Sequence, residues 1–301
     1  MHALSLSLLL LTSTTIVSAT DLLLPLYTDP GSSGANWATV QSSLANNPSL
    51  AARVVINVDN GPGNPFAKGG DGANWVAGAS ALADLPNVSV LGYVHTTQAT
   101  RAYTEVIADV NSWASWVTSH GVALDGIFLD EAPASVCSSC VTYMRNLTTY
   151  IRDTAELPFV VYNPGFPATV GALDDYYAIG PDLINALETC FAETSDGEDL
   201  CTPAGSYTIY DEDGYGTTID STLESWVGTQ YYSQTSILIH GFHGTNGLYS
   251  ATSATLSSEL QAIVERGIGA AVFTTDQWIT PDVGPADITT VADLLNEANG
   301  A

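Results

Sequence analysis

Eight short apolar segments, each ending in a polar or acidic residue, constrain the fold of this chain more than any other feature. They read LLLPLYTD, RVVINVDN, VSVLGYVHT, LDGIFLDE, PFVVYNPG, LINALETCF, SILIHGF and AAVFTTD. Apolar runs of this length that are rich in Val, Ile and Leu are typical of buried strands. Polar groups gathered where such strands end indicate a functional cleft, because burying unpaired polar groups in a packed core costs free energy.

Helical patterns separate these segments. In the best example, Tyr, Val, Ile and Trp side chains recur at steps of three and four from Tyr103 to Val117. Other helices are expected over residues 36–50, 73–85, 140–155, 221–234, 254–266 and 286–298. Strand–helix alternation predicts a parallel sheet covered on both faces. Eight such units predict a single α/β domain over residues 20–301, a (β/α)₈ barrel of the TIM type.

The alternative fold is a doubly wound open sheet. Gly31-Ser-Ser-Gly34 follows the first strand, where dinucleotide-binding proteins carry their glycine-rich turn. The segment lacks the full GxGxxG pattern, so the barrel is preferred. The chain also has no GxSxG motif, which excludes an α/β-hydrolase.

The charge balance limits the partners. The 301 residues include 32 Asp and Glu but only six Lys and Arg, giving a formal net charge of −26. No basic surface is available for nucleic acid or for an anionic membrane. The acidic field favours neutral or cationic partners, including amine-bearing polymers, although a surface kept soluble by its charge is the plain alternative.

Residues 1–19 are predicted to be a signal peptide. An apolar run through Leu11 is followed by the small residues Val17-Ser18-Ala19, and the run is too short to span a membrane. We therefore expect a secreted monomer, extracellular or in the cell wall. Asn87-Val-Ser and Asn146-Leu-Thr are glycosylation sequons.

Four cysteines fit an oxidising compartment. Neighbours in sequence are the expected pairs, Cys137 with Cys140 and Cys190 with Cys201. Alternatively, Cys137-Ser-Ser-Cys140 is a redox-active CxxC motif, but no thioredoxin-type sequence surrounds it. A zinc site is disfavoured by the cysteine spacing.

Side chains at the carboxyl ends of the strands are the candidates for chemistry, because barrel enzymes place their catalytic groups there. The set holds acids, amides, imidazoles and aromatic rings but no lysine: Tyr27, Asp29, Asn57, Tyr93, His95, Asp130, Glu131, Asn163, Glu188, His240, Asp276 and Trp278. Paired carboxylates beside rings that stack on sugars suit glycoside hydrolysis. We predict Asp130, Glu131 and Glu188 to be catalytic and the others to bind substrate.

Each candidate has a structural alternative. Asp130 could cap the helix that follows it, as acids do at helix N-termini. Asn57 and Asn163 could hold the backbone of their loops in place. Glu188 lies within an apolar strand and needs a partner or a raised pKa. His95 and His240 lack the close spacing of a metal motif, so we predict no metal and no other cofactor.

Two loops stand out by composition. Residues 60–72 are rich in glycine and proline and are a candidate lid. Residues 191–220 are acidic, but their spacing matches no EF-hand, so a solvated loop is preferred over a calcium site.

Seven motifs in order carry a family resemblance. They are Leu24-Pro-Leu-Tyr27, Val55-Ile-Asn57 with Gly61-Pro-Gly63, Gly92-Tyr-Val-His-Thr96, Asp125-Gly-Ile-Phe-Leu-Asp-Glu131, Tyr162-Asn-Pro-Gly165, Ile237-Leu-Ile-His-Gly241 and Thr274-Thr-Asp276. The series resembles the spherulation-specific family 4, or spherulin-4-like, proteins. Some fungal members hydrolyse galactosaminogalactan, an exopolysaccharide containing N-acetylgalactosamine. The resemblance implies a (β/α)₈ barrel with a hydrolase site on Asp130, Glu131 and Glu188.

The expected reaction is endo-acting, retaining hydrolysis of an amino-sugar polymer. Glu131 is expected to be the general acid, with its pKa raised by Asp130 and by burial, and Glu188 the opposing carboxylate. In the substrate-assisted alternative, the acetamido group of the sugar attacks and Asp130 orients it. The alternative functions are a non-catalytic carbohydrate-binding wall protein and a metal-dependent deacetylase or phosphoesterase.

Overall fold

A computed structural model describes residues 19–135, 137–165, 171–191, 223, 226–242, 253–274 and 287–301 of the chain. The elements in order are β1 (Asp21–Leu26), η1 (Ser32–Trp37), α1 (Ala38–Asn46), β2 (Ala52–Ile56), α2 (Gly72–Ala83), β3 (Val88–His95), α3 (Tyr103–His120), β4 (Gly126–Asp130), α4 (Ser138–Asp153), β5 (Phe159–Tyr162), α5 (Asp174–Tyr177), β6 (Leu183–Cys190), η3 (Thr229–Gln234), β7 (Thr235–His240), α7 (Ser253–Glu265), β8 (Ala270–Phe273) and α8 (Ile288–Ala298).

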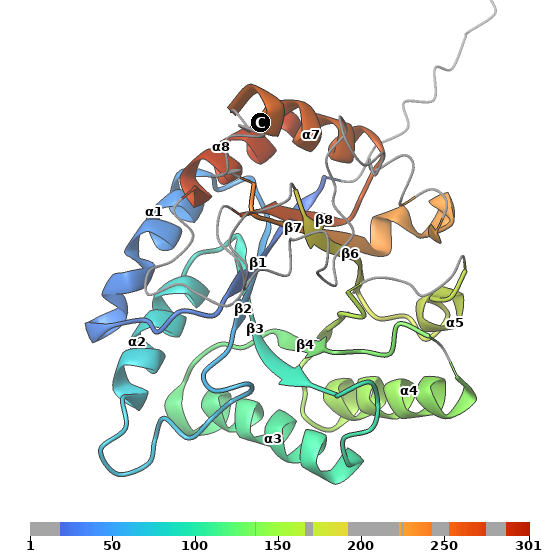
Figure 1. The fold of residues 1–301 in the computed structure, drawn as a ribbon. Coiled ribbons are helices and arrows are strands. Elements are labelled where there is room, and N and C mark those ends of the chain that lie inside the picture. Colours follow the sequence, from blue (N-terminus) through green and yellow to red (C-terminus); the bar gives the residue numbers. More distant parts are fainter. Residues whose placement is uncertain are drawn as a thin grey trace, which may run out of the picture.

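The eight strands form a closed parallel barrel in sequence order, and the helices surround it (Figure 1). Pairing of Asp21 with Ala270 and of Leu22 with Ala271 joins β1 to β8. Every apolar segment singled out in the sequence overlaps one of these strands. The predicted barrel is therefore confirmed, and the open sheet is excluded because its edge strands would not pair.

The barrel has two apolar layers because alternate residues of a strand face opposite ways. One cluster fills the inside: Leu23, Val55, Leu91, Tyr93, Phe128, Val161, Leu183 and Ala270. The second cluster lies between the strands and the helices and includes Ile127 and Leu129. On β4, Phe128 is thus inside, and the same alternation carries Asp130 to the inside one step further on.

An ionic cluster lies at the amino ends of the strands, opposite the end where Asp130 lies. Arg53 contacts Asp21 at 3.0 Å and donates to Ser89 Oγ at 2.6 Å. Its guanidinium also lies 4.7 Å from the centre of the Phe159 ring. These contacts link β1, β2, β3 and β5 at their amino ends.

Most predicted helices are confirmed within a few residues. The long periodic segment forms α3, and its Trp113 packs flat against Gly92, where an added Cβ would meet the indole ring at 2.6 Å. Only glycine fits this close helix–strand contact. Of the helix expected over 221–234, residues 229–234 form the 3₁₀-helix η3 instead. The four-residue helix α5 was not predicted, since it is too short to show a period.

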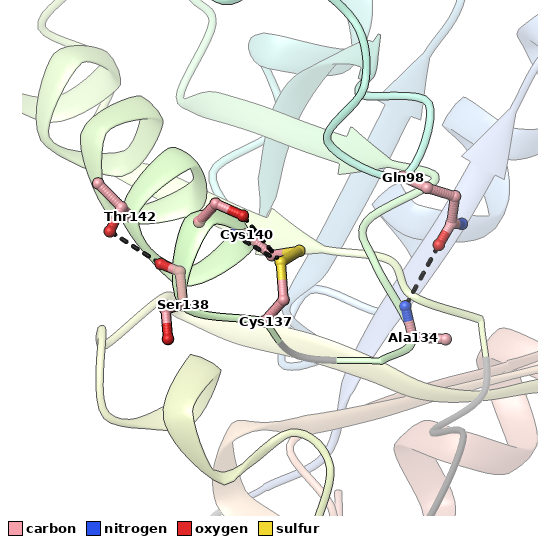
Figure 2. Close-up of a disulfide and its surroundings, with 7 residues drawn as sticks. Gln98, Ala134, Cys137, Ser138, Cys140 and Thr142 are labelled. Carbon is pink, nitrogen blue, oxygen red and sulfur yellow. Dashed lines mark hydrogen bonds between the residues drawn. A yellow bond between two sulfur atoms is a disulfide. The ribbon is translucent and has the colours of Figure 1, made fainter.

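The disulfide between Cys137 and Cys140 is present at the start of α4, as predicted (Figure 2). Cys190 is also disulfide-bonded, and its predicted partner Cys201 lies outside the described residues. The predicted signal peptide likewise falls almost wholly outside them. Within the part of the chain that the structure describes, no helix combines the length and apolarity needed to cross a bilayer.

Candidate active site

A pocket of about 620 Å³ opens at the carboxyl end of the barrel. Its wall combines three carboxylates with amides, an imidazole, two tyrosine rings and a few apolar groups: Pro25, Tyr27, Asn57, Asn60, Tyr93, Gln98, Asp130, Glu131, Asn163, Pro164, Gly165, Glu188, Leu238 and His240. All three predicted catalytic residues therefore share one hollow.

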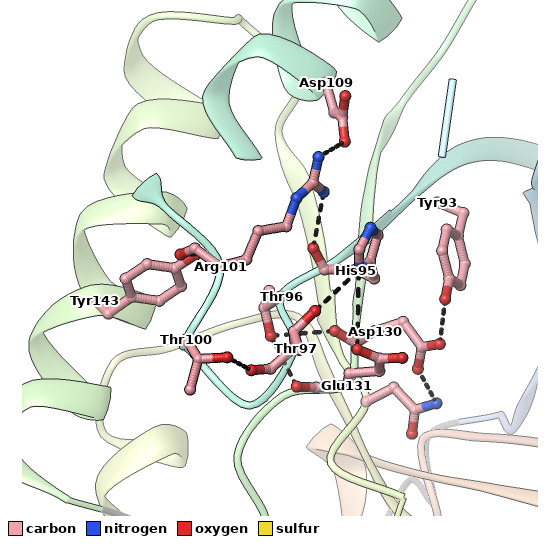
Figure 3. A network of polar contacts seen from close by, with 11 residues as sticks. Tyr93, His95, Thr96, Thr97, Thr100, Arg101, Asp109, Asp130, Glu131 and Tyr143 are labelled. Carbon is pink, nitrogen blue, oxygen red and sulfur yellow. Dashed lines mark hydrogen bonds and ion pairs between the residues drawn. The ribbon is translucent and has the colours of Figure 1, made fainter. Parts of the chain in front are cut away.

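Asp130 is held at the floor of this pocket by two donors. The Tyr93 hydroxyl donates to Oδ2 at 2.6 Å, and Asn163 Nδ2 donates to Oδ1 at 2.7 Å. Tyr93 belongs to β3 and is in register with Phe128, while Asn163 directly follows β5. Figure 3 shows the Tyr93 contact from close by. Both oxygens of Asp130 accept hydrogen bonds, an arrangement suited to a carboxylate.

Glu188 lies beside Asp130 and is held in the same way. His240 Nε2 contacts Oε1 at 3.1 Å, and Asn163 Nδ2 donates to Oε2 at 2.8 Å. Asn185 Nδ2 lies 3.4 Å from the same oxygen and donates to Asn163 Oδ1 at 2.8 Å. The sequence predicted that Glu188 would need a partner. The partners are the side-chain amides of Asn163 and Asn185 and the imidazole of His240.

A β-bulge makes this arrangement fit. Asn185 and Glu188 are three residues apart and would face opposite sides of a regular strand. The β6–β7 register shifts between Asn185 and Leu187, leaving Ala186 as the extra residue. A bulge re-aims the residues that follow it. Both polar side chains consequently point into the barrel, while Leu187 packs in the outer core.

The electrostatics of the pair follow from this crowding. Burial and the negative charge of Glu188 raise the pKa of Asp130 to about 6, although the hydrogen bonds from Tyr93 and Asn163 oppose the rise. Burial and Asp130 in turn raise the pKa of the Tyr93 hydroxyl far above its usual range. Tyr93 therefore keeps its proton and serves as a donor to Asp130.

Glu131 differs from its neighbour. Its side chain is 46% exposed, so the expected burial of Glu131 was wrong, and the carboxyl whose pKa is raised by burial is that of Asp130. Glu131 has a φ of 51°, a left-handed conformation that is unusual outside glycine. This turn moves Glu131 off the strand alternation, so its carboxylate lies at the rim, 3.8 Å from His95 Nδ1.

The β3–α3 loop fixes this turn. Thr97, Gln98 and Ala99 have φ values of 49°, 54° and 58°, three left-handed residues in a row. Gln98 N donates to the Glu131 carbonyl at 2.8 Å, and Thr96 Oγ1 donates to the same oxygen at 2.8 Å. Left-handed residues persist where surrounding contacts hold them, often at functional sites.

Most of the predicted binding residues also reach the pocket. Tyr27, Asn57, Tyr93, Asn163 and His240 line it. Asn57 also anchors its loop, since Oδ1 accepts from Gly61 N at 2.8 Å, the role given as its alternative.

Others are placed elsewhere. Asp29 is exposed and does not line the pocket, and its Oδ1 accepts a hydrogen bond from Gly31 N at 2.7 Å. His95 lines an adjoining hollow. Asp276 and Trp278 lie outside the described residues.

Sequence reasoning missed three polar residues, Asn60, Gln98 and Asn185. Asn60 and Gln98 are on loops, where no periodicity shows which side chains point inward. Asn185 lies in the strand segment LINALETCF, and its polarity among apolar residues was a usable signal. Its side chain is fully buried, so its amide required partners.

The histidines do not converge on each other. His95 lies beside Glu131, while His240 lies beside Glu188. Among the residues that the structure describes, no group of three or more His, Cys, Asp or Glu side chains has the arrangement of a metal site.

Comparisons with known proteins agree with the fold. The structure is similar to that of Sph3 from Aspergillus clavatus, solved in complex with GalNAc, with a TM-score of 0.66 and 23% identity over 92% of this chain and 98% of the other. It is also similar to the class V chitinase of Nicotiana tobaccum, with a TM-score of 0.56 and 12% identity over 92% and 99% of the two chains. At these identities the likeness shows a shared barrel fold.

Sequence comparison gives the family. Spherulin-4 from Physarum polycephalum is 31% identical over 163 residues, which cover 54% of this chain and 43% of that protein. The match thus spans less than half the length of that relative. The profile of spherulation-specific family 4 matches residues 21–281, which include every strand of the barrel. The chain therefore belongs to the spherulation-specific family 4.

Proposed function

We propose that the protein is a secreted glycoside hydrolase that cleaves an exopolysaccharide containing N-acetylgalactosamine or galactosamine. The observation that carries the proposal is the convergence of Asp130, Glu131 and Glu188 on one open pocket at the carboxyl end of the barrel. Two of these carboxylates, Asp130 and Glu188, lie largely out of contact with solvent among fixed donors, and Glu131 is exposed at the rim. Glycosidases need such a division between a proton donor and a stabilising or attacking carboxylate.

Glu131 is the proton donor in this proposal. Its carboxyl group is accessible to a glycosidic oxygen entering from the solvent side, and the Gln98 and Thr96 contacts fix the backbone that carries it. Asp130 is less suited to the task, because both of its oxygens already accept hydrogen bonds.

Asp130 and Glu188 supply negative charge beneath the reacting sugar. Asp130 Oδ1 and Glu188 Oε2 accept from the same nitrogen at 2.7 and 2.8 Å. Their separation cannot exceed the sum of these distances, so the two carboxylates act on the same sugar. We propose retention of configuration, in which a group on this side of the sugar attacks the anomeric carbon while Glu131 protonates the leaving oxygen. The attacking group is either Glu188 or the acetamido oxygen of the substrate with Asp130 orienting its N–H.

The substrate assignment rests on charge and on the related barrels. With a formal net charge of −26, the protein attracts neutral or amine-bearing polymers over anionic ones. Sph3 was solved with GalNAc, and the Cycas revoluta chitinase with a GlcNAc tetrasaccharide. A carbohydrate-active barrel for amino sugars is the function that these neighbours support, and the Cys137–Cys140 disulfide supports secretion. We propose a monomer.

The direct test is cleavage of purified polysaccharides by the mature protein. Galactosamine-rich exopolysaccharide, chitin and an uncharged glucan are incubated with the protein, and the products are identified by mass spectrometry. Release of short galactosamine-containing fragments is expected from the first polymer alone, and oligomeric products would establish endo action. The anomer released, followed by NMR, reports retention or inversion.

Variants test the assigned residues. Glu131→Gln, Asp130→Asn and Glu188→Gln are each expected to lower kcat by about 10²-fold or more, because general acid–base and charge-stabilising groups contribute at that scale. Glu156→Gln is the matched control, since Glu156 is exposed and is not among the residues that line the pocket. Binding of glycans without cleavage of any polymer would identify a carbohydrate-binding protein instead. Loss of activity with a chelator would favour a metal-dependent hydrolase.

A further inference from the structure

A second hollow of about 340 Å³ adjoins the pocket. The β2–α2 loop, the end of β3 and α3 form its wall, and the residues used below are Asp59, Asn60, His95, Arg101, Asp109 and Ser112. Its volume falls within the range of about 300–1,000 Å³ that small-molecule sites occupy. None of the proposed catalytic carboxylates lines it.

The two hollows meet at two points. Asn60 lines both of them. Glu131 lines the first hollow and lies 3.8 Å from His95, which lines the second. In Figure 3, His95 lies between Asp130 and Glu131 on one side and the Arg101–Asp109 pair on the other. A chain of sugars leaving the first hollow past Glu131 therefore enters the second.

The wall of the second hollow is fixed. Arg101 and Asp109 form an ion pair at 2.6 Å, with side chains only 17% and 23% exposed. Arg101 also donates to the His95 carbonyl at 3.1 Å, and the Tyr143 hydroxyl donates to the Arg101 carbonyl at 2.9 Å. These bonds tie α3 and α4 to the end of β3. The shape of the hollow is consequently set before any ligand arrives.

Free polar groups remain at its rim. Within the part of the chain that the structure describes, the Asp59 carboxylate, the Asn60 amide and the Ser112 hydroxyl have no side-chain hydrogen bond, and His95 uses only Nδ1. They offer donors and acceptors to a ligand rich in hydroxyl groups. Asp59 and Asp109 outnumber Arg101, so the hollow carries a net negative charge. This charge disfavours uronic acids and sulfated sugars.

We infer that this second hollow binds the sugar residue on the leaving-group side of the bond that Glu131 protonates, and that it takes a neutral or amine-bearing sugar. The inference rests on the proposed hydrolase function. Because a general acid stands at the boundary between the two sugars whose bond it cleaves, the place of Glu131 between the hollows assigns them to opposite sides of that bond.

The test separates this site from the catalytic pocket by the size of the substrate. Asp59→Asn and Ser112→Gln, which fills the hollow with a longer side chain, are compared with wild type on a galactosamine-containing oligosaccharide. The same proteins are assayed on an aryl glycoside, whose small leaving group does not need the second hollow. Asp153→Asn is the control, because it removes the same charge from an exposed position at the end of α4.

Both variants are expected to lower kcat/KM for the oligosaccharide by about tenfold, the scale of one hydrogen bond to a charged group, and to change the aryl glycoside rate less than twofold. Equal losses on both substrates, or none on either, would overturn the inference. If wild type cleaves neither substrate, the proposed function fails. Sugar binding in the second hollow is then tested by calorimetry. Asp59→Asn must weaken oligosaccharide binding and Asp153→Asn must not.

Discussion

The carboxylates of Asp130 and Glu188, which come from β4 and β6, accept hydrogen bonds from one nitrogen, Asn163 Nδ2, at 2.7 and 2.8 Å. Asn163 Oδ1 in turn accepts from Gly165 N and from Asn185 Nδ2, so the orientation of the amide is fixed. One neutral side chain thus holds two like charges together at the floor of the pocket.

Asn163→Ala tests this clamp. Loss of the Asn163 amide removes a hydrogen bond that lowers the pKa of Asp130, so the pKa of Asp130 should rise above about 6. The acidic limb of the kcat/KM profile should then move to higher pH, with a loss of at least about tenfold at pH 7. Tyr93→Phe, which removes only the other donor to Asp130, should shift the same limb. A fall in rate without any shift would show a purely structural role.

The pKa of Asp130 also predicts how stability depends on pH. It is about 6 in the folded protein and about 3.9 in an unfolded chain, so the stability that this group contributes is present below about pH 4 and is lost as the pH rises through 6. Asp130→Asn should therefore raise the free energy of unfolding by about 2 kcal/mol at pH 7.5 and by much less at pH 4. Urea denaturation at the two pH values measures this, with Asp153→Asn as the control. Equal changes at both values would contradict it.

The bulge at Ala186 can be tested by deletion. Removing this residue leaves Asn185 and Glu188 two positions apart, so a regular strand keeps both side chains inside the barrel and Leu187 in the outer core. We expect the deletion variant to fold and to keep most of its activity, as measured by thermal denaturation and polysaccharide turnover. Ala186→Gly keeps the extra residue and should also keep both the fold and most of the activity. Complete loss of activity in a folded deletion variant would show that the spacing of Asn185 and Glu188 is not what aims Glu188.

Arg53→Met tests the opposite end of the barrel. The change leaves Asp21 without its ion-pair partner, and we expect a cost of about 1–3 kcal/mol in urea denaturation, since the pair is only partly buried. The double variant with Asp21→Asn should recover much of this loss. Because the pair is remote from the pocket, kcat/KM of the folded fraction should stay within twofold of wild type.

The two sequons should differ in occupancy. Asn146 is exposed on α4, whereas Asn87 Nδ2 contacts the carbonyl oxygens of Leu44, Asn47 and Leu50 at 3.2, 3.0 and 2.8 Å. A glycan on Asn87 would replace one of the hydrogens that make these bonds. Peptide mapping of protein expressed through a eukaryotic secretory pathway should find the glycan on Asn146 alone. A folded, active protein glycosylated at Asn87 would contradict this.

Much of the site was predictable because strand ends in a barrel must meet. Asp130, Asn163 and Glu188 each follow or end an apolar segment, so ring closure brings them together. Glu131 shows the limit of this reasoning. Its place after Asp130 suggested burial, but a left-handed backbone at Glu131 moves it to the rim. No pattern of residue types announces that turn.

The sequence by itself determined the eight strands, the helices between them and the chemical types at the strand ends, because apolar periodicity is a local property. Tertiary structure decided which carboxylate is buried, how Asn163 links two acids and that Ala186 turns Glu188 inward. These outcomes depend on contacts between residues 25 to 58 positions apart and on the burial they create. Such contacts exist only once the barrel has closed.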